Sequence, residues 1–198
     1  SRMAASPFSM YHSGKVRLFI LHLSFPTVAL LISFACVIAL STGPVLAQEI
    51  SELEKRNGFK DIKLGTPVDS VKGIVLEKEF KERNEFPAKL YRVDNEAYTT
   101  IGEVKVSRVE LKSYKDTIYE IGVWTAKDPR LMKALESLYG KADFDMKNET
   151  YFWKTDNIVL KFKSEGKGKL VLTYISPPVH KSMKDDKDKK VDDIANDF

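Results

Sequence analysis

The strongest constraint on the fold is the alternation of apolar and polar residues in two long stretches, 103–125 and 151–174. Successive side chains of a β-strand point to opposite faces, so a repeat of two predicts strands with one buried face. Val109 and Leu111, for example, share a face within the first stretch. The pattern predicts antiparallel strands that follow one another along the chain.

The first hairpin can be predicted to the residue. The favoured register joins apolar faces and opposite charges, in the pairs Leu111 with Ile121, Val109 with Val123, Arg108 with Trp124, and Lys112 with Glu120. The competing register sets Glu110 against Glu120, which repels. The favoured register needs a loop of odd length, so we predict a three-residue tip at 115–117. Ser107 and Arg108 interrupt the alternation and mark either a bulge or a switch of the buried face.

The last third of the chain predicts a meander of strands. Their apolar faces are Tyr151 and Trp153, then Ile158, Leu160 and Phe162, then Leu170, Leu172 and Tyr174. A three-residue tip at 165–167 would set Phe162 opposite Leu170 and Leu160 opposite Leu172. These aromatic residues are therefore expected in the core.

Two helices are predicted, at 66–75 and 128–139. Thr66 is a suitable N-cap for the first, with Pro67 after it. Asp128 caps the second, and Gly140 ends it.

Between the helices, the mixed charges of 77–84 predict a solvated connection, and a strand is expected at 89–93. Together the elements predict an α+β fold, in which an antiparallel sheet of five or six strands has two helices packed on one face.

The chain divides by composition. Residues 18–40 carry no charged side chain and are followed by Gly43-Pro44 and by Val45-Leu46-Ala47, which resembles a signal-peptidase site. We predict a signal peptide at 1–47, with an uncleaved N-terminal membrane anchor as the alternative.

A lead-in at 48–57, a single α+β domain at 58–176 and a charged C-terminal tail at 177–198 follow. The helical spacing of Val191, Ile194 and Phe198 is compatible with a short helix in the tail. Such a helix would dock weakly on the domain or on a partner.

Net charge argues against a nucleic-acid partner. Three of the 32 basic residues lie in the first 17, and all 28 acidic residues lie at or beyond Glu49, so from Gln48 onward 29 basic residues face 28 acidic ones. This balance lacks the basic excess that nucleic-acid binding requires. Contact with a membrane is expected only through the N-terminal segment.

Few residues are available for catalysis or metal binding. The single cysteine, Cys36, lies in the apolar run, and His180 is the only histidine beyond it. Thiol nucleophiles, zinc sites and serine triads thus become improbable, and His180 is expected to be an exposed bystander.

Short motifs have structural explanations as well. Lys72 and Gly73 do not follow the Walker pattern, Lys147 occupies a ligand position of the calcium-loop pattern that starts at Asp143, and Ser164 to Lys167 matches Ser-x-x-Lys without its companion motifs. Asn148 to Thr150 is a glycosylation pattern. We predict no catalytic, cofactor-binding or metal residue and no cofactor.

Four segments carry a family resemblance: FKDIKLGTPVDSVK, YKDTIYEIGVW, LMKALESLYGKAD and YFWKTDNIVLKF. Together, over about residues 58–176, they resemble a loosely defined group of small exported bacterial α+β domains of unassigned activity. A more distant likeness is to the small domain of outer-membrane assembly lipoproteins. Both resemblances imply a bacterial envelope protein.

The sequence therefore predicts an exported, non-enzymatic binding or envelope-interaction module, periplasmic or extracellular, whose partner is an unknown protein or envelope component. A hydrolase that uses Asp or Glu carboxylates is the alternative function.

Overall fold

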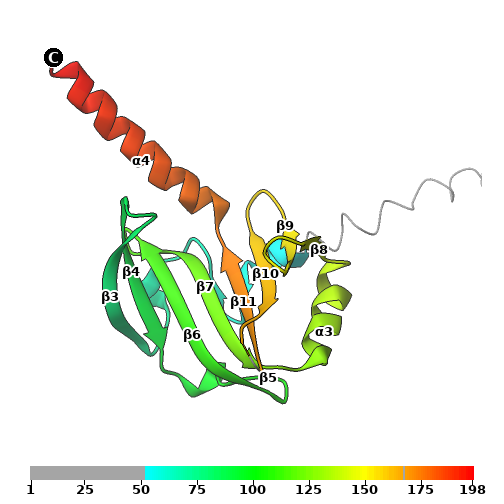
Figure 1. Ribbon diagram of the computed structural model, residues 1–198. Helices are drawn as coiled ribbons and strands as arrows, with labels where there is room; N and C mark the ends of the chain where they lie inside the picture. Colours follow the sequence, from blue (N-terminus) through cyan, green and yellow to red (C-terminus); the bar gives the residue numbers. More distant parts are fainter. Residues whose placement is uncertain (1–51, 167) are drawn as a thin grey trace, which may run out of the picture. The chain divides into compact units, whose positions relative to one another are not determined.

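The computed structural model describes residues 52–166 and 168–198. The predicted signal peptide or anchor, its cleavage site after Ala47, and Cys36 lie outside this part of the chain. The described part is dominated by one nine-stranded antiparallel sheet (Figure 1). The predicted α+β fold, with five or six strands and two helices on one face, is therefore wrong, and the fold is mostly β.

The large sheet has the strand order β3-β4-β6-β7-β11-β10-β9-β8, and β5 pairs with β6. Its strands are β3 (Ile74–Glu82), β4 (Phe86–Val93), β5 (Thr100–Ile101), β6 (Val104–Tyr114), β7 (Thr117–Ala126), β8 (Asp143–Asp145), β9 (Thr150–Lys154), β10 (Val159–Ser164) and β11 (Lys169–Ile175). A separate two-stranded sheet joins β1 (Gly58–Phe59) and β2 (Ile62–Lys63). The helical elements are residues 52–56, the 3₁₀ turns η1 (Val68–Ser70) and η2 (Glu96–Tyr98), α3 (Pro129–Tyr139) and α4 (Pro177–Asn196).

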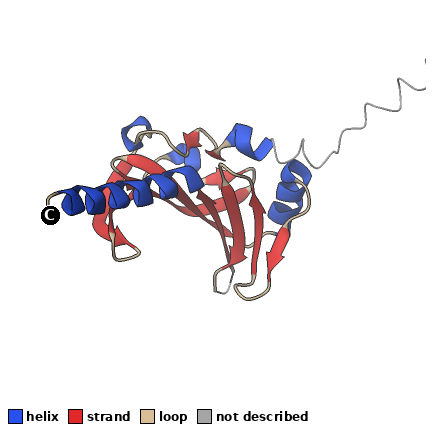
Figure 2. Ribbon diagram, turned by 90° about the horizontal axis from the view of Figure 1, so that it is seen from above, coloured by secondary structure: helices blue, strands red, loops and turns tan. Residues whose placement is uncertain are grey.

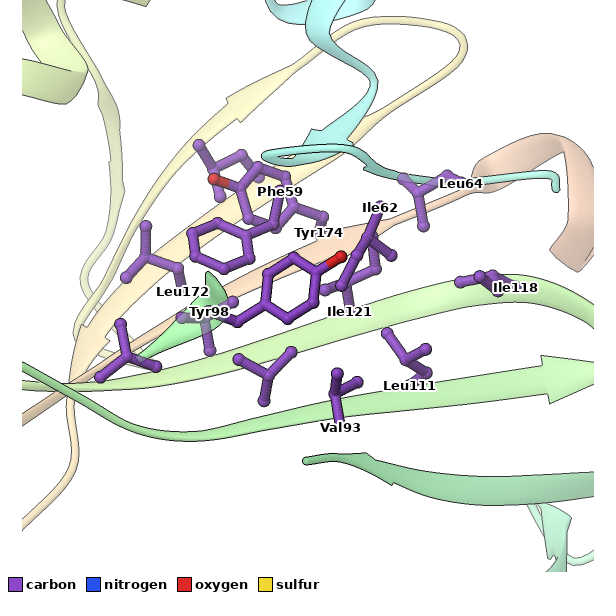
Figure 3. Close-up of a cluster of buried hydrophobic side chains, with 14 of the residues drawn as sticks. Phe59, Ile62, Leu64, Val93, Tyr98, Leu111, Ile118, Ile121, Leu172 and Tyr174 are labelled. Carbon is purple, nitrogen blue, oxygen red and sulfur yellow. The ribbon is translucent and has the colours of Figure 1, made fainter. Parts of the chain in front are cut away.

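One face of the sheet carries the main core. The segment 52–71 lies behind the strands in Figure 1, where it is drawn in cyan. It covers this face together with α3. Figure 3 shows Phe59, Ile62 and Leu64 from that segment directed toward Ile121 and Leu172 of the sheet. All are buried, so this layer provides most of the hydrophobic stabilisation.

The register of the central hairpin is confirmed. The four predicted pairs are present: Leu111 with Ile121, Val109 with Val123, Arg108 with Trp124, and Lys112 with Glu120. The predicted three-residue tip is wrong, because Tyr114 pairs with Thr117 and only Lys115 and Asp116 lie between them. Both have positive φ, of 47° and 60°, as a two-residue type I′ turn requires.

A bulge reconciles the short turn with the correct register. Glu120 pairs with Lys112, whereas Ile118 pairs with Ser113, so Tyr119 is an extra residue on β7. Ile118 and Ile121 consequently both reach the main core although they are three residues apart. Tyr119 is left to point to the opposite face.

Two further predictions concern the bulge at Ser107 and the register of the last hairpin. The interruption at Ser107 is a bulge, since the register shifts between Val106 and Arg108. The predicted register of the last hairpin is wrong by two residues, because Phe162 pairs with Leu172 and not with Leu170. Gly166 and Gly168, both with positive φ, allow a longer connection. A shift by two residues leaves the same side chains in the core.

The helix predicted at 128–139 is confirmed as α3. Asp128 accepts a hydrogen bond from the Arg130 N–H at 2.8 Å, which caps the first turn. Gly140 ends the helix with φ 82° and ψ −175°, a conformation that favours glycine. Leu131, Leu135 and Tyr139 attach the helix to the core.

The helix predicted at 66–75 is wrong. Pro67 is extended, and only η1 is helical there. The start of β7 holds this segment in place of a helix: the Gly65 N–H donates to the Ile118 carbonyl at 2.8 Å, and the Ile118 N–H donates to the Thr66 carbonyl at 2.9 Å. Thr66 is not a cap, because its hydroxyl donates to the Lys63 carbonyl. Pairing with a distant strand has overridden local helix signals.

The predicted connection at 77–84 and the segment of the calcium-loop pattern at Asp143 are strands. Most of the connection expected at 77–84 belongs to β3, and Asp143–Asp145 forms β8. Both are edge strands of the sheet. Most of the side chains of β3 remain in solvent, so neither strand shows the alternation by which buried strands are recognised. The strand expected at 89–93 lies within β4.

The charged tail forms α4, which starts after β11 and projects beyond the sheet (Figure 1). Figure 2 shows several short helices on one side of the sheet. In the first turns of α4, the predicted bystander His180 packs edge-on against Tyr119 with ring centroids 5.2 Å apart. The expectation of an exposed His180 is therefore wrong.

Candidate functional site

A second, smaller core holds α4 against the sheet. Phe86 and Ala88 of β4 point to the face opposite Tyr91, because alternate residues of a strand face opposite ways. They pack with Tyr114, Tyr119 and Met183, and Met183 is the buried residue of α4.

Tyr119 also ties this core to β3. Its hydroxyl donates a 2.7 Å hydrogen bond to Glu82 Oε2. Burial, with that hydrogen bond, raises the pKa of Tyr119 well above its usual range. Tyr119 therefore remains a neutral donor, and it links β3, β7 and α4.

Beside this second core, the ladder between β4 and β6 comes to its end. The pairing of β4 with β6 stops at Lys89 and Ser113, although β4 begins at Phe86 and β6 continues to Tyr114. A groove of about 540 Å³ lies at this end of the sheet. Its lining residues are Glu79, Phe80, Lys81, Pro87, Ala88, Lys89, Ser113, Tyr114, Lys115, Asp116 and Lys190. We call this cavity the β4–β6 groove.

The walls of the β4–β6 groove contain apolar surface. Phe80, Pro87, Ala88 and Tyr114 provide the apolar surface. Ser113 is 1% exposed, and its hydroxyl has no hydrogen-bond partner among the described residues. Buried hydroxyl groups are normally hydrogen-bonded, but the Ser113 side chain alternates with that of Tyr114 and therefore faces away from the second core.

The cationic rim divides into paired and unpaired lysines. Lys89 Nζ lies 3.0 Å from Asp116 Oδ1, and Lys115 Nζ lies 2.6 Å from Asp186 Oδ2. Their hydrogen bonds to these carboxylates raise the pKa of both lysines. Within the described part of the chain, Lys190 of α4 makes no ion pair. The rim is therefore able to attract an anionic group.

A second hollow, of about 580 Å³, lies farther along β3, β4 and β6. Its charges neutralise one another. Arg108 lies 2.7 Å from Glu77 Oε2 and also contacts Glu110, while Lys112 Nζ lies 2.9 Å from Glu120 Oε1. Charges already paired in this way have little to offer a ligand, so we place the site in the β4–β6 groove.

The motifs found in the sequence lie away from the groove. Asp145 Oδ1 accepts from the Lys147 N–H at 3.0 Å, so this carboxylate stabilises a turn. Ser164 ends β10, and Lys167 is outside the described residues. Asn148 lies in the exposed turn between β8 and β9. Across residues 52–198 without 167, no three His, Cys, Asp or Glu side chains gather as a metal site requires.

Sequence reasoning missed the groove entirely. Its residues come from β3, β4, β6, a turn and α4, and two of these elements were expected to be a loop and a loose tail. The available signal was Lys115-Asp116 at the predicted hairpin tip. Asp is common in two-residue turns that need positive φ, and a short turn implies a bulge and a displaced Tyr119.

The fold and the groove define an antiparallel β-sheet domain with a ligand-sized cavity under a carboxy-terminal helix. The chain belongs to the TP0088 domain family, whose model matches residues 57–186. The family name states a domain and no activity. The match gives no support to the likeness with outer-membrane assembly lipoproteins.

No curated protein and no solved structure matches the chain significantly. Within the described residues, no helix combines the length and the apolar character needed to span a bilayer.

Proposed function

We propose that the chain is an exported, non-enzymatic binding module whose β4–β6 groove takes an amphiphile with one apolar chain and an anionic head group. The observation that carries this proposal is the groove at the end of the β4–β6 ladder, which has apolar walls and lysines at its rim. Its size lies in the range of about 300–1,000 Å³ that is typical of small-molecule sites.

The two parts of such a ligand match different parts of the groove. An acyl or alkyl chain would cover Phe80, Ala88 and Tyr114, which removes apolar surface from water. A carboxylate or phosphate would lie near the ammonium group of Lys190 at the rim. An envelope component with this chemistry fits the export that the amino-terminal sequence predicts.

The alternative, a hydrolase with Asp or Glu as catalytic groups, has less support. Among the described residues that line the groove, the acidic ones are Glu79 and Asp116, and Asp116 is paired with Lys89. A pair of carboxylates that face each other across bound substrate would be needed for such chemistry.

Calorimetric titration of the full chain with dodecanoate, dodecanol and dodecyltrimethylammonium, each below its micelle concentration, tests the proposal. We expect dodecanoate to bind most tightly. Lys190→Glu should weaken dodecanoate binding several-fold, whereas Lys189→Glu, a matched change on the same helix outside the groove, should not. Equal binding of all three amphiphiles, or equal effects of the two variants, would refute the assignment.

Ser113→Ala separates a role in binding from a role in folding. The unpartnered hydroxyl is costly to bury, so its removal should leave the melting temperature unchanged or raise it. Dodecanoate affinity should be unchanged in this variant, because the hydroxyl is buried on the face away from the second core. The export part is tested by amino-terminal sequencing of the exported protein, which should begin at Gln48. A chain that retains 18–40 would support the membrane anchor.

A further inference from the structure

β3 forms one edge of the large sheet, and no strand in the described part of the chain pairs with its outer side (Figure 1). An unpaired edge presents a row of free N–H and C=O groups to other chains. Proteins usually protect such edges with charges and bulges, and β3 has both. The order of the charges along β3, however, also restricts the register in which a second strand could pair with it.

The regular part of β3 is short and has a clear centre. A register shift between Leu76 and Lys78 marks a bulge at Glu77. After Glu82, Arg83 and Asn84 turn the chain with positive φ. The regular stretch is therefore 78–82, with the sequence Lys-Glu-Phe-Lys-Glu and Phe80 in the middle.

Two copies of an edge strand can pair antiparallel in one sheet only about a two-fold axis perpendicular to that sheet. One residue on this axis then faces its own copy. Lys78, Glu79, Lys81 or Glu82 in that position would each face an identical charge, which repels. Phe80 is the residue of the stretch that can face itself without repulsion.

With Phe80 on the axis, every flanking residue also faces a residue of opposite charge. Glu79 then faces Lys81 of the second copy, and Lys78 faces Glu82 of the second copy. Each pair occurs twice by symmetry, and all join opposite charges. Glu82 already accepts from Tyr119, while neither Glu79 nor Lys81 has an ion pair among the described residues.

We propose that the chain forms a two-fold dimer through antiparallel pairing of β3 with β3 of a second copy, centred on Phe80. The two sheets become one continuous sheet. The charges that discourage other strands select this register. Five paired residues make a small interface, so the dimer is reversible and its population rises with concentration.

Disulfide trapping of the full chain tests the register. In a Cys36→Ser background, Phe80→Cys places two thiols opposite each other, where facing Cβ atoms are about 4.5–5.5 Å apart. Mild oxidation should give a covalent dimer. Lys78→Cys is the matched control. The two thiols, one from each copy, then lie four residues apart along the paired strands, so this variant should give no covalent dimer above background. Equal trapping at 78 and 80, or none at 80, would overturn the register.

Because Phe80 is half-buried, a second variant avoids any loss of folding. Glu79→Cys with Lys81→Cys changes two exposed residues that face each other across the proposed interface. Within one strand, the Cβ atoms of these two positions are about 6.6 Å apart, whereas a disulfide requires about 3.5–4.5 Å. A disulfide must therefore join two copies. A covalent dimer from this variant supports the pairing, and its absence overturns it.

Charge reversal gives an independent test by sedimentation across protein concentrations. Lys81→Glu sets like charges opposite each other twice and should weaken the dimer roughly tenfold. Adding Glu79→Lys restores opposite charges and should restore the dimer. A simple loss of stability would not be rescued by the second change, so failure of rescue would refute the proposal.

Discussion

Met183 attaches α4 to the sheet, and its truncation should release the helix. The side chain is 1% exposed, and it packs with Phe86, Ala88, Tyr114 and Tyr119. Truncation of a buried methionine to alanine costs about 2–5 kcal/mol when the cavity remains. Alanine has at least the helix propensity of methionine, so any loss of helix must come from lost packing.

The remaining attachments of α4 are weaker. Lys187 contacts Glu85, and Asp186 accepts from Tyr114 and Lys115, but these groups are exposed or partly exposed. Exposed ion pairs contribute about 0–1 kcal/mol each. Met183→Ala therefore removes a large part of the docking free energy, while the packing of Val179 and of His180 against Tyr119 remains. Most of the stability of a helix in a protein comes from tertiary packing, so a detached α4 should also lose helical content.

Hydrogen exchange measured by mass spectrometry provides the assay. In Met183→Ala, peptides from 177–190 should lose protection, while peptides from β7 and β11 keep it. The matched control is Val191→Ala, on the same helix and 55% exposed, which should change stability by no more than about 0.5 kcal/mol. Unchanged protection of α4 in Met183→Ala, or equal effects of the two variants, would contradict this account of docking.

Two further predictions concern single residues. Gly140→Ala should destabilise the protein by about 1–3 kcal/mol in urea titration, because φ 82° with ψ −175° suits glycine alone; an unchanged midpoint would show that α3 can end otherwise. Burial, and secondarily the charge of Arg83, lowers the pKa of His180 below its usual 6.5. The unfolded chain thus binds a proton first as the pH falls, so stability is retained above 6.5 and is lost as the pH drops toward the lowered pKa. Melting temperatures across this window should fall less in His180→Gln, and equal falls would exclude the histidine as the cause.

Sequence alone predicted the elements whose stability is local or follows a strict pattern. The pairs Val109 with Val123 and Leu111 with Ile121 followed from apolar alternation and charge pairing, and both are present. Helix α3 was recognised from its cap and its end. In these elements, residues close in sequence carry the decisive information.

The failures share a physical cause. At 66–75, a good cap and an apolar stripe predicted a helix, but hydrogen bonds to Ile118 fixed an extended chain. At 77–84, the mixed charges predicted a solvated connection, but main-chain pairing with β4 fixed a strand whose charges face water. Both outcomes depend on partners far away in sequence, and no local pattern reports them.

The β4–β6 groove was not predicted, because it lies beside a second core that depends on one inserted residue. The two-residue turn at Lys115-Asp116 and the register of Lys112 with Glu120 are compatible only if β7 has one residue more than β6. That residue, Tyr119, turns to the far face, where it becomes the centre of the second core and contacts α4. Without the bulge, Tyr119 would point into the main core, and the second core would lose the ring that packs against His180 of α4. The second core, which shares Ala88 and Tyr114 with the β4–β6 groove, therefore arises from a conflict between turn and register that the fold resolves with a bulge.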